Sequence, residues 1–253
     1  MKVANILPNN CIKEGMLRQD VEMFLTHKIL EDPQRFAFLA NEKGEHYKIL
    51  DNSACELGEG LDLRDVLEAA KIIDADEIVL PDIPRSGKSM CKTLKYLADV
   101  PQSCKYKLAA VVQGETDQEI ADCAMQILSL RRINTIMIPK WYCGWNSTNG
   151  MGRIRITSQI VDMMCKMRKA KEIHWLGLDT GFRELIHPIN AVVRSVDTGY
   201  FAALTIEKWK DYDIFADRPR ELKIDLQHMD VDIEKLQSII DIQKQFLEGE
   251  MDV

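Results

Sequence analysis

The segment that decides the fold is residues 107–140, KLAAVVQGETDQEIADCAMQILSLRRINTIMIPK, which holds one complete strand–helix–strand unit. KLAAVVQG (107–114) and TIMIPK (135–140) are nearly continuous apolar runs, as expected for strands buried on both faces of a parallel sheet. Between them, Thr116 followed by Glu119 forms a capping-box pattern for the start of a helix. The segment therefore predicts a βαβ unit.

The same alternation continues on both sides of this unit. Repeated units of this kind are typical of α/β proteins, and eight candidate strands favour a closed (β/α)8 TIM-type barrel over an open sheet, in a single domain of residues 1–253. The predicted strands are VANILP (3–8), FAFLAN (36–41), YKILDNS (47–53), EIVLPD (77–82), KLAAVVQG (107–114), TIMIPK (135–140), IHWLGL (173–178) and VVRSVDT (192–198). The predicted helices are 63–73, 86–100, 116–130, 157–171 and 181–192, the last broken at Pro188.

Two segments depart from the simple repeat. FAFLAN (36–41) and YKILDNS (47–53) are joined by a short glycine-containing turn, which predicts an N-terminal antiparallel β-hairpin and would place one of the two strands outside the barrel. Residues 231–250 form an acidic amphipathic pattern that predicts a C-terminal helix. We expect this helix to pack on the barrel or on a partner, which leaves a homodimer open.

Composition indicates an ordinary water-soluble globular protein, with 46% hydrophobic and 29% charged residues. No apolar run approaches the roughly 20 residues that span a bilayer, and MKVANILPNN does not resemble a signal peptide, so we expect a cytoplasmic protein with no membrane partner. The seven cysteines are scattered and form no C-x-x-C pair, which argues against a disulfide framework or a structural zinc site. The sequence predicts no metal and no cofactor.

The net charge of −7 is unevenly distributed. Residues 131–171 hold nine Lys or Arg against one acid, Asp162, which is the pattern of a local polyanion-binding surface. A solvated basic helix face would give the same pattern. The cations assigned to nucleic-acid binding are Lys140, Arg153, Arg155, Arg168, Lys169 and Lys171.

Polar residues end several of the predicted strands. Asp51, Asp82 and Asp197 directly follow apolar runs, and Gln113 ends another. Because the carboxyl ends of barrel strands line the active site, we expect these side chains to converge, although an aspartate there can also simply cap a helix. A carboxylate can accept both N–H donors of the guanine edge, and an amide can donate to its carbonyl. Two further carboxylates suit glycosidic chemistry through a covalent intermediate.

Six short motifs, in order over about 150 residues, resemble those of the tRNA-guanine transglycosylases. They are LDNSACE (50–56), IVLPDIP (78–84), VVQGE (111–115), IPKW (138–141), HWLGL (174–178) and SVDTG (195–199). The resemblance implies that Asp197 is the nucleophile that displaces guanine and that Asp51 is the general base for the incoming base. It also implies that Asp82 holds guanine N1 and N2, and that Gln113 contacts O6.

The resemblance further implies that Leu176 and Gly177 form a wall of the base slot. Asn52 is assigned to substrate binding, and Trp141 or Tyr142 is expected to supply the stacking that the family obtains from an aromatic residue in its first motif. The family's zinc site is missing, because no cysteine follows Cys165 in this sequence. In this the chain is similar to the zinc-free DpdA-type enzymes, which implies insertion of a 7-deazaguanine base of the preQ0 type into DNA.

The sequence therefore predicts a base-exchange glycosyltransferase that acts on nucleic acid, with DNA preferred over tRNA. Three alternatives stay open at this stage. The same chemistry could act on tRNA, the barrel could be an inactive partner subunit, or it could be an unrelated barrel enzyme acting on a sugar or small metabolite.

Overall fold

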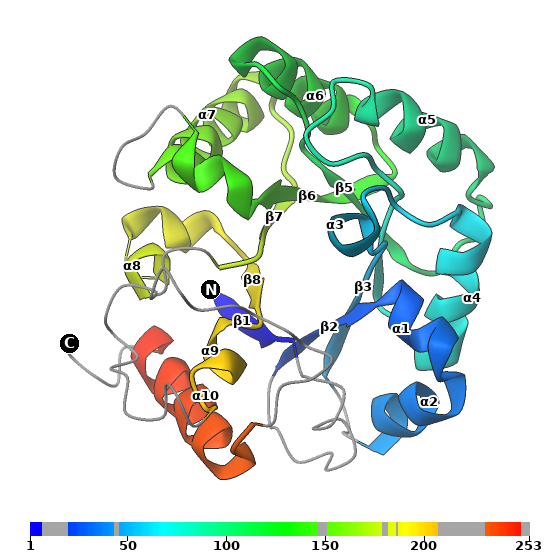
Figure 1. Ribbon diagram of the computed structural model, residues 1–253. Helices are drawn as coiled ribbons and strands as arrows, with labels where there is room; N and C mark the ends of the chain where they lie inside the picture. The colour runs from blue at the N-terminus through cyan, green and yellow to red at the C-terminus, as the bar shows by residue number, and fades with distance from the viewer. Residues whose placement is uncertain are drawn as a thin grey trace.

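Eight parallel strands form one sheet, which curls into a nearly closed barrel with the helices around its outside (Figure 1). The strands lie in the order β1, β8, β7, β6, β5, β4, β3, β2, so the (β/α)8 TIM-type barrel predicted from the sequence is confirmed. The strands are β1 (Lys2–Asn5), β2 (Val21–Leu25), β3 (Tyr47–Asp51), β4 (Glu77–Val79), β5 (Lys107–Val111), β6 (Ile133–Pro139), β7 (Glu172–Leu176) and β8 (Ser195–Thr198). The computed structural model describes residues 1–6, 20–42, 46–145, 151–178, 182–185, 187–206 and 231–248.

Most of the helices lie outside the strands and cover the outer face of the barrel, whereas the short helix α3 lies over the opening at the carboxyl ends of the strands (Figure 1). They are α1 (Thr26–Glu31), α2 (Pro33–Glu42), α3 (Ala54–Leu57), α4 (Leu63–Ile73), α5 (Ser89–Asp99), α6 (Asp117–Ser129), α7 (Gly152–Met167), α8 (Phe182–Leu185), α9 (Tyr200–Ala203) and α10 (Ile233–Leu247), with 3-10 helices η2 (Lys140–Gly144) and η3 (Pro188–Val192). In the described part of the chain, no helix is long and apolar enough to cross a membrane.

Alternation along the strands separates the apolar core into two clusters. On β3, Leu50 packs outward against the helices, whereas Ile49 belongs to a smaller cluster inside the barrel. Strands β1 to β6 each contribute to this inner cluster, whose buried members are Ala4, Val21, Met23, Ile49, Val79, Ala109, Val111 and Met137. The cluster fills the middle of the barrel along β1 to β6, whereas β7 and β8 contribute the buried polar residues His174 and Ser195 there.

The predicted N-terminal hairpin is wrong. FAFLAN lies within α2, where Phe36, Leu39 and Ala40 are buried and Phe38 is 53% exposed, which is helical spacing. The missing strand is β2, which pairs in parallel with β3 and aligns Leu25 with Asp51. A short apolar run fits a strand or a buried helix equally well, and Pro33, at the first position of α2, marks the helix start.

Most helix predictions are confirmed, with shifted ends. Helix α4 has the predicted bounds, and the Thr116 hydroxyl caps α6 by accepting from the Glu119 N–H at 3.2 Å. Helix α5 begins at Ser89, three residues after the predicted start of this helix, and α7 covers Gly152–Met167 instead of 157–171. Helix α10 covers the described part of the predicted 231–250 helix and buries Leu236, Ile239 and Ile240 in the outer core, so it packs on the barrel itself.

Candidate active site

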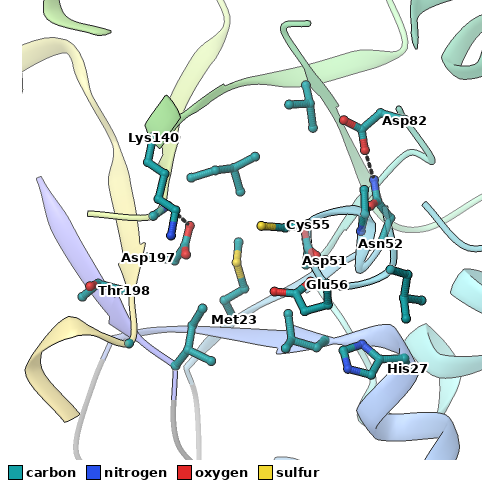
Figure 2. A pocket seen from close by; sticks show the side chains of 18 of the residues that line it. Met23, His27, Asp51, Asn52, Cys55, Glu56, Asp82, Lys140, Asp197 and Thr198 are labelled. Carbon is teal, nitrogen blue, oxygen red and sulfur yellow. Dashed lines mark hydrogen bonds between the residues drawn. The ribbon is translucent and has the colours of Figure 1, made fainter. Parts of the chain in front are cut away.

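A pocket of about 620 Å³ opens at the carboxyl ends of the strands, where the sequence predicts an active site. Asp51, Asp82 and Asp197 all line it, so the structure brings together the three aspartates that end predicted strands. Figure 2 shows Asp197 and Lys140 on one side of the pocket and Asp51 and Glu56 on the other. The remaining predicted site residues that line it are Asn52, Gln113, Lys140, Trp141, Leu176 and Gly177.

Asp197 is buried on β8 and is held through one carboxylate oxygen. Its Oδ1 lies 3.0 Å from Nε2 of His174 and accepts the backbone N–H of Gly177 at 3.0 Å. Among the described residues, no hydrogen-bond donor contacts Oδ2. A carboxylate anchored through one oxygen keeps the other available for attack on a carbon atom.

Asp51 is the last residue of β3, and its Oδ2 accepts the backbone N–H of Ser53 at 2.7 Å. Desolvation in the pocket raises the pKa of Asp51 well above its ordinary value, and the neighbouring carboxylates of Glu56, Asp82 and Asp197 raise it further. A carboxyl group of this kind can hold a proton closer to neutral pH than an exposed aspartate. Such a group is suited to general acid–base work.

Asp82 is buried between two amide side chains. Its Oδ1 accepts from Asn52 Nδ2 at 2.8 Å, and its Oδ2 accepts from Gln113 Nε2 at 2.6 Å. Burial raises the pKa of Asp82, and these two hydrogen bonds act in the opposite direction. Asn52 also donates to the Leu80 carbonyl at 2.7 Å and accepts from the Ala54 N–H at 2.8 Å. Its two amide hydrogens are therefore committed to Asp82 and to the Leu80 carbonyl rather than open to a ligand.

Gln113 keeps one donor for a ligand. Its Oε1 accepts the backbone N–H of Arg85 at 2.9 Å, and one of its two Nε2 hydrogens goes to Asp82. The Arg85 guanidinium lies over the Trp141 ring, 5.6 Å from its centroid, at the edge of the same pocket. A cation stacked on an aromatic ring can form a platform on which a base stacks.

Gly177 connects the floor of the pocket to a buried ion pair. Its φ of +70° favours glycine, and a Cβ there would approach Cδ of Lys140 to 2.7 Å. Its carbonyl and that of Leu176 accept from Nη1 of Arg153, whose guanidinium also pairs with Glu184. Arg153 is fully buried, so its predicted role in nucleic-acid binding is wrong. It supports the segment that holds Asp197.

Comparisons with known proteins find no matching family model and no matching curated protein. Among solved structures, the chain is similar to D-psicose 3-epimerase from Clostridium cellulolyticum H10, determined with D-tagatose. The TM-score is 0.50 at 12% sequence identity, and the match covers 100% of both chains. The two proteins share a barrel fold. At this identity the likeness carries no statement about substrate or reaction.

The other predicted nucleic-acid contacts lie apart from one another. Lys140 lines the pocket, and Arg155 pairs with Asp117 at 3.3 Å. Lys171 immediately precedes β7 and donates to the carbonyl of Leu130 at 2.9 Å, at the end of the barrel opposite the pocket. Arg168 and Lys169 precede it in the same connection. Arg168, Lys169 and Lys171 therefore lie at the other end of the strands from the pocket, and their contact with nucleic acid stays a prediction.

Sequence reasoning missed two groups in the pocket. His27 follows the unrecognised strand β2, and its Nδ1 lies 2.8 Å from the hydroxyl of Ser53. Burial and the nearby Lys28 lower the pKa of His27. Glu56, on α3, has a raised pKa because the pocket desolvates it and Asp197 lies nearby. His174 is fully buried on β7, and its position two residues before Leu176 places both side chains inside the barrel.

Proposed function

We propose that the protein is a pentosyltransferase that replaces guanine in a nucleic acid, DNA in preference to tRNA, by a 7-deazaguanine base of the preQ0 type. The observation that supports this most is Asp82, a buried carboxylate fixed by two amides in a pocket that holds two further aspartates. A carboxylate so fixed can accept the two N–H groups of a guanine edge. The remaining hydrogen of Gln113 is suited to its carbonyl.

Asp197 and Asp51 divide the chemistry. Oδ2 of Asp197 attacks the anomeric carbon, the C1′–N9 bond breaks, and its electron pair leaves with guanine, which takes the proton held by the Asp51 carboxyl. The glycosyl ester of Asp197 then holds the sugar while the bases exchange. Asp51, when ionised, removes the N9 proton of the incoming base, whose N9 attacks C1′ and releases the Asp197 carboxylate.

The target base must leave its stack to reach the pocket, which costs a few kcal/mol in a duplex. The Trp141 ring with Arg85 above it offers a surface on which a flipped or flanking base can stack. Among the cations assigned to nucleic-acid binding, Lys140 lines the pocket, where it can contact a phosphate next to the target nucleotide.

The experiment is an exchange assay with purified protein and radiolabelled guanine, in which duplex DNA and bulk tRNA are offered separately. We expect label to enter DNA, and Asp197→Asn to abolish incorporation. Asp162→Asn, which changes an exposed aspartate on α7, is the matched control and should exchange at the rate of the unaltered protein.

The outcomes separate the parts of this proposal. Label that enters only tRNA would overturn the preference for DNA and keep the chemistry. Absence of label from both polymers would overturn base exchange. Full activity of Asp197→Asn would remove that residue as the nucleophile.

A further inference from the structure

The interior of the barrel differs between two of its strands and the other six. At mid-height, β1 to β6 contribute the apolar cluster around Ile49, Val79 and Met137. At the corresponding positions β7 and β8 contribute His174 and Ser195, which are aligned with each other in the sheet register and are fully buried. A path of polar side chains therefore crosses the barrel interior beside the inner apolar cluster.

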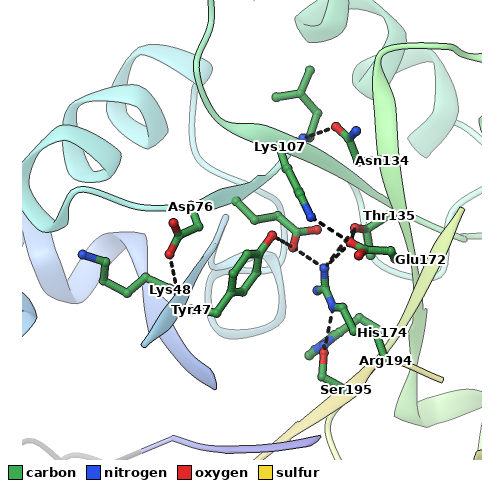
Figure 3. Close-up of polar contacts among 12 residues, drawn as sticks. Tyr47, Lys48, Asp76, Lys107, Asn134, Thr135, Glu172, His174, Arg194 and Ser195 are labelled. Atoms are coloured by element: carbon green, nitrogen blue, oxygen red, sulfur yellow. Dashed lines mark hydrogen bonds and ion pairs between the residues drawn. The ribbon is translucent and has the colours of Figure 1, made fainter. Parts of the chain in front are cut away.

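This path is continuous from one end of the barrel to the other. At the base, Nε of Arg194 donates to Oγ of Ser195 at 3.2 Å (Figure 3). The Ser195 hydroxyl lies 2.8 Å from Nδ1 of His174, and Nε2 of His174 lies 3.0 Å from Oδ1 of Asp197. Arg194 is itself held by Glu77 and Glu172, each 2.7 Å from its Nη1.

Arg194 sets the direction of the hydrogen bonds along this path, because it is the donor at the base. A guanidinium can only donate, so the Ser195 oxygen accepts from Arg194 and its hydrogen remains to be placed. Among the described residues, Nδ1 of His174 is the acceptor within reach of that hydroxyl. If Nδ1 carried its own hydrogen, the buried serine hydrogen would have no partner, which costs about 1–3 kcal/mol.

We infer that Arg194 and Ser195 fix His174 as the neutral Nε2–H tautomer, so that His174 donates to Asp197 and positions it for attack. His174 is a positioning residue, because it acts through Asp197 without lying at the reacting atoms. Together with the Gly177 N–H it occupies Oδ1 and directs Oδ2 into the pocket. The catalytic part of this inference rests on the proposed function, whereas the tautomer does not.

The tautomer can be measured on the intact protein labelled with 15N-histidine, by long-range 1H–15N correlation, with His174→Gln used to assign the signal. We expect a single Nε2–H form in the unaltered protein. In Ser195→Ala, Nδ1 loses its donor and becomes open to protonation, so a second form protonated on Nδ1 should appear. Tyr47→Phe is the matched control, because it removes a hydrogen bond to Glu77 in the same cluster but off the path.

A Nδ1–H or doubly protonated His174 in the unaltered protein would overturn the inference, as would an unchanged spectrum in Ser195→Ala. In the exchange assay, Ser195→Ala should lower kcat about tenfold with KM for the base within about twofold. Ser195→Thr, which keeps the hydroxyl, should restore kcat. If the unaltered protein shows the Nε2–H form but exchanges no base on either polymer, the proposed function fails and the tautomer assignment stands.

Discussion

The two ends of the barrel both gather acidic side chains but compensate them differently. At the base, Glu77 and Glu172 share the guanidinium of Arg194, and the Tyr47 hydroxyl donates to Glu77 at 2.9 Å. Burial acts to raise the pKa of Glu172, but Arg194 and Lys107 hold it below its ordinary value. Both of these acids therefore have a cation, and the cluster ties β3, β4, β5, β7 and the start of β8 together.

At the mouth the acids lack such partners. Desolvation raises the pKa of Asp51, Asp82 and Glu56, and within the described residues Lys140 forms no ion pair with any of them. Uncompensated buried acids cost stability, and proteins retain them at sites where chemistry requires a shifted pKa. The comparison teaches that the base serves the fold and that the mouth is where function is to be sought.

The comparison is tested most strongly by Asp51→Asn. If the mouth is catalytic, loss of this acid–base group should lower turnover by about 10²–10⁴ while the covalent adduct of Asp197 with nucleic acid still forms. Single-turnover assays and adduct detection on denaturing gels measure the two steps. Normal turnover would mean that Asp51 has only a structural role, as the acceptor of the Ser53 N–H in the turn after β3.

At the base, Arg194→Met should act on stability. It leaves Glu77, which is fully buried, without its cation, and we expect a loss of about 3–5 kcal/mol in the free energy of unfolding. The control is Lys107→Met, whose partner Glu172 has a side chain 41% exposed and which should cost less than about 1 kcal/mol. Equal losses in urea denaturation would contradict the contrast between buried and exposed pairs.

Asp82→Asn should weaken binding of guanine by about 1–3 kcal/mol, because one acceptor for the base edge becomes a donor. Isothermal titration calorimetry with the free base measures this. Asp122→Asn, on the outer face of the barrel in α6, is the control and should leave the affinity unchanged. Equal affinity in both variants would mean that Asp82 does not contact the base.

The raised pKa of Asp51 also predicts a pH-dependent effect on stability. A group whose pKa is raised on folding contributes stability below its unfolded pKa of about 3.9 and loses that contribution as pH rises through the folded value. Asp51→Asn should therefore melt at a higher temperature than the unaltered protein at pH 8, with the difference vanishing near pH 4. A constant difference across this range would contradict the direction of the shift.

The smallest expected effect is on the dependence of DNA affinity on salt concentration. Lys140→Ala should reduce the slope of log affinity for DNA against log salt by about 0.9, the value for one phosphate contact. Joint replacement of Arg168, Lys169 and Lys171 by Ala should leave the slope unchanged, since they lie at the opposite end of the barrel. The reverse result would place the polyanion at the base.

The strand–helix alternation was enough to predict the barrel, and strand ends were enough to predict the position of Asp51, Asp82 and Asp197. The local sequence pattern gave wrong predictions where contacts with distant residues decide the secondary structure or the burial of a residue. FAFLAN is apolar enough for a strand, and its helical burial depends on packing against α4. Arg153 reads as a surface cation because its partner Glu184 lies 31 residues away and no local pattern reveals the pair.

Ser53 carries a consequence for anyone who would evolve this protein in the laboratory. Its backbone is left-handed, with φ of 64°, which costs a residue with a side chain about 1 kcal/mol that glycine avoids. The Ser53 hydroxyl accepts the backbone N–H of His27 at 3.2 Å, and it also lies 2.8 Å from Nδ1 of the His27 ring. Ser53→Gly would relieve that strain but leave the backbone N–H of His27 without its acceptor, at about 1–3 kcal/mol, so a library screened for heat tolerance would keep serine at this position despite its strained backbone.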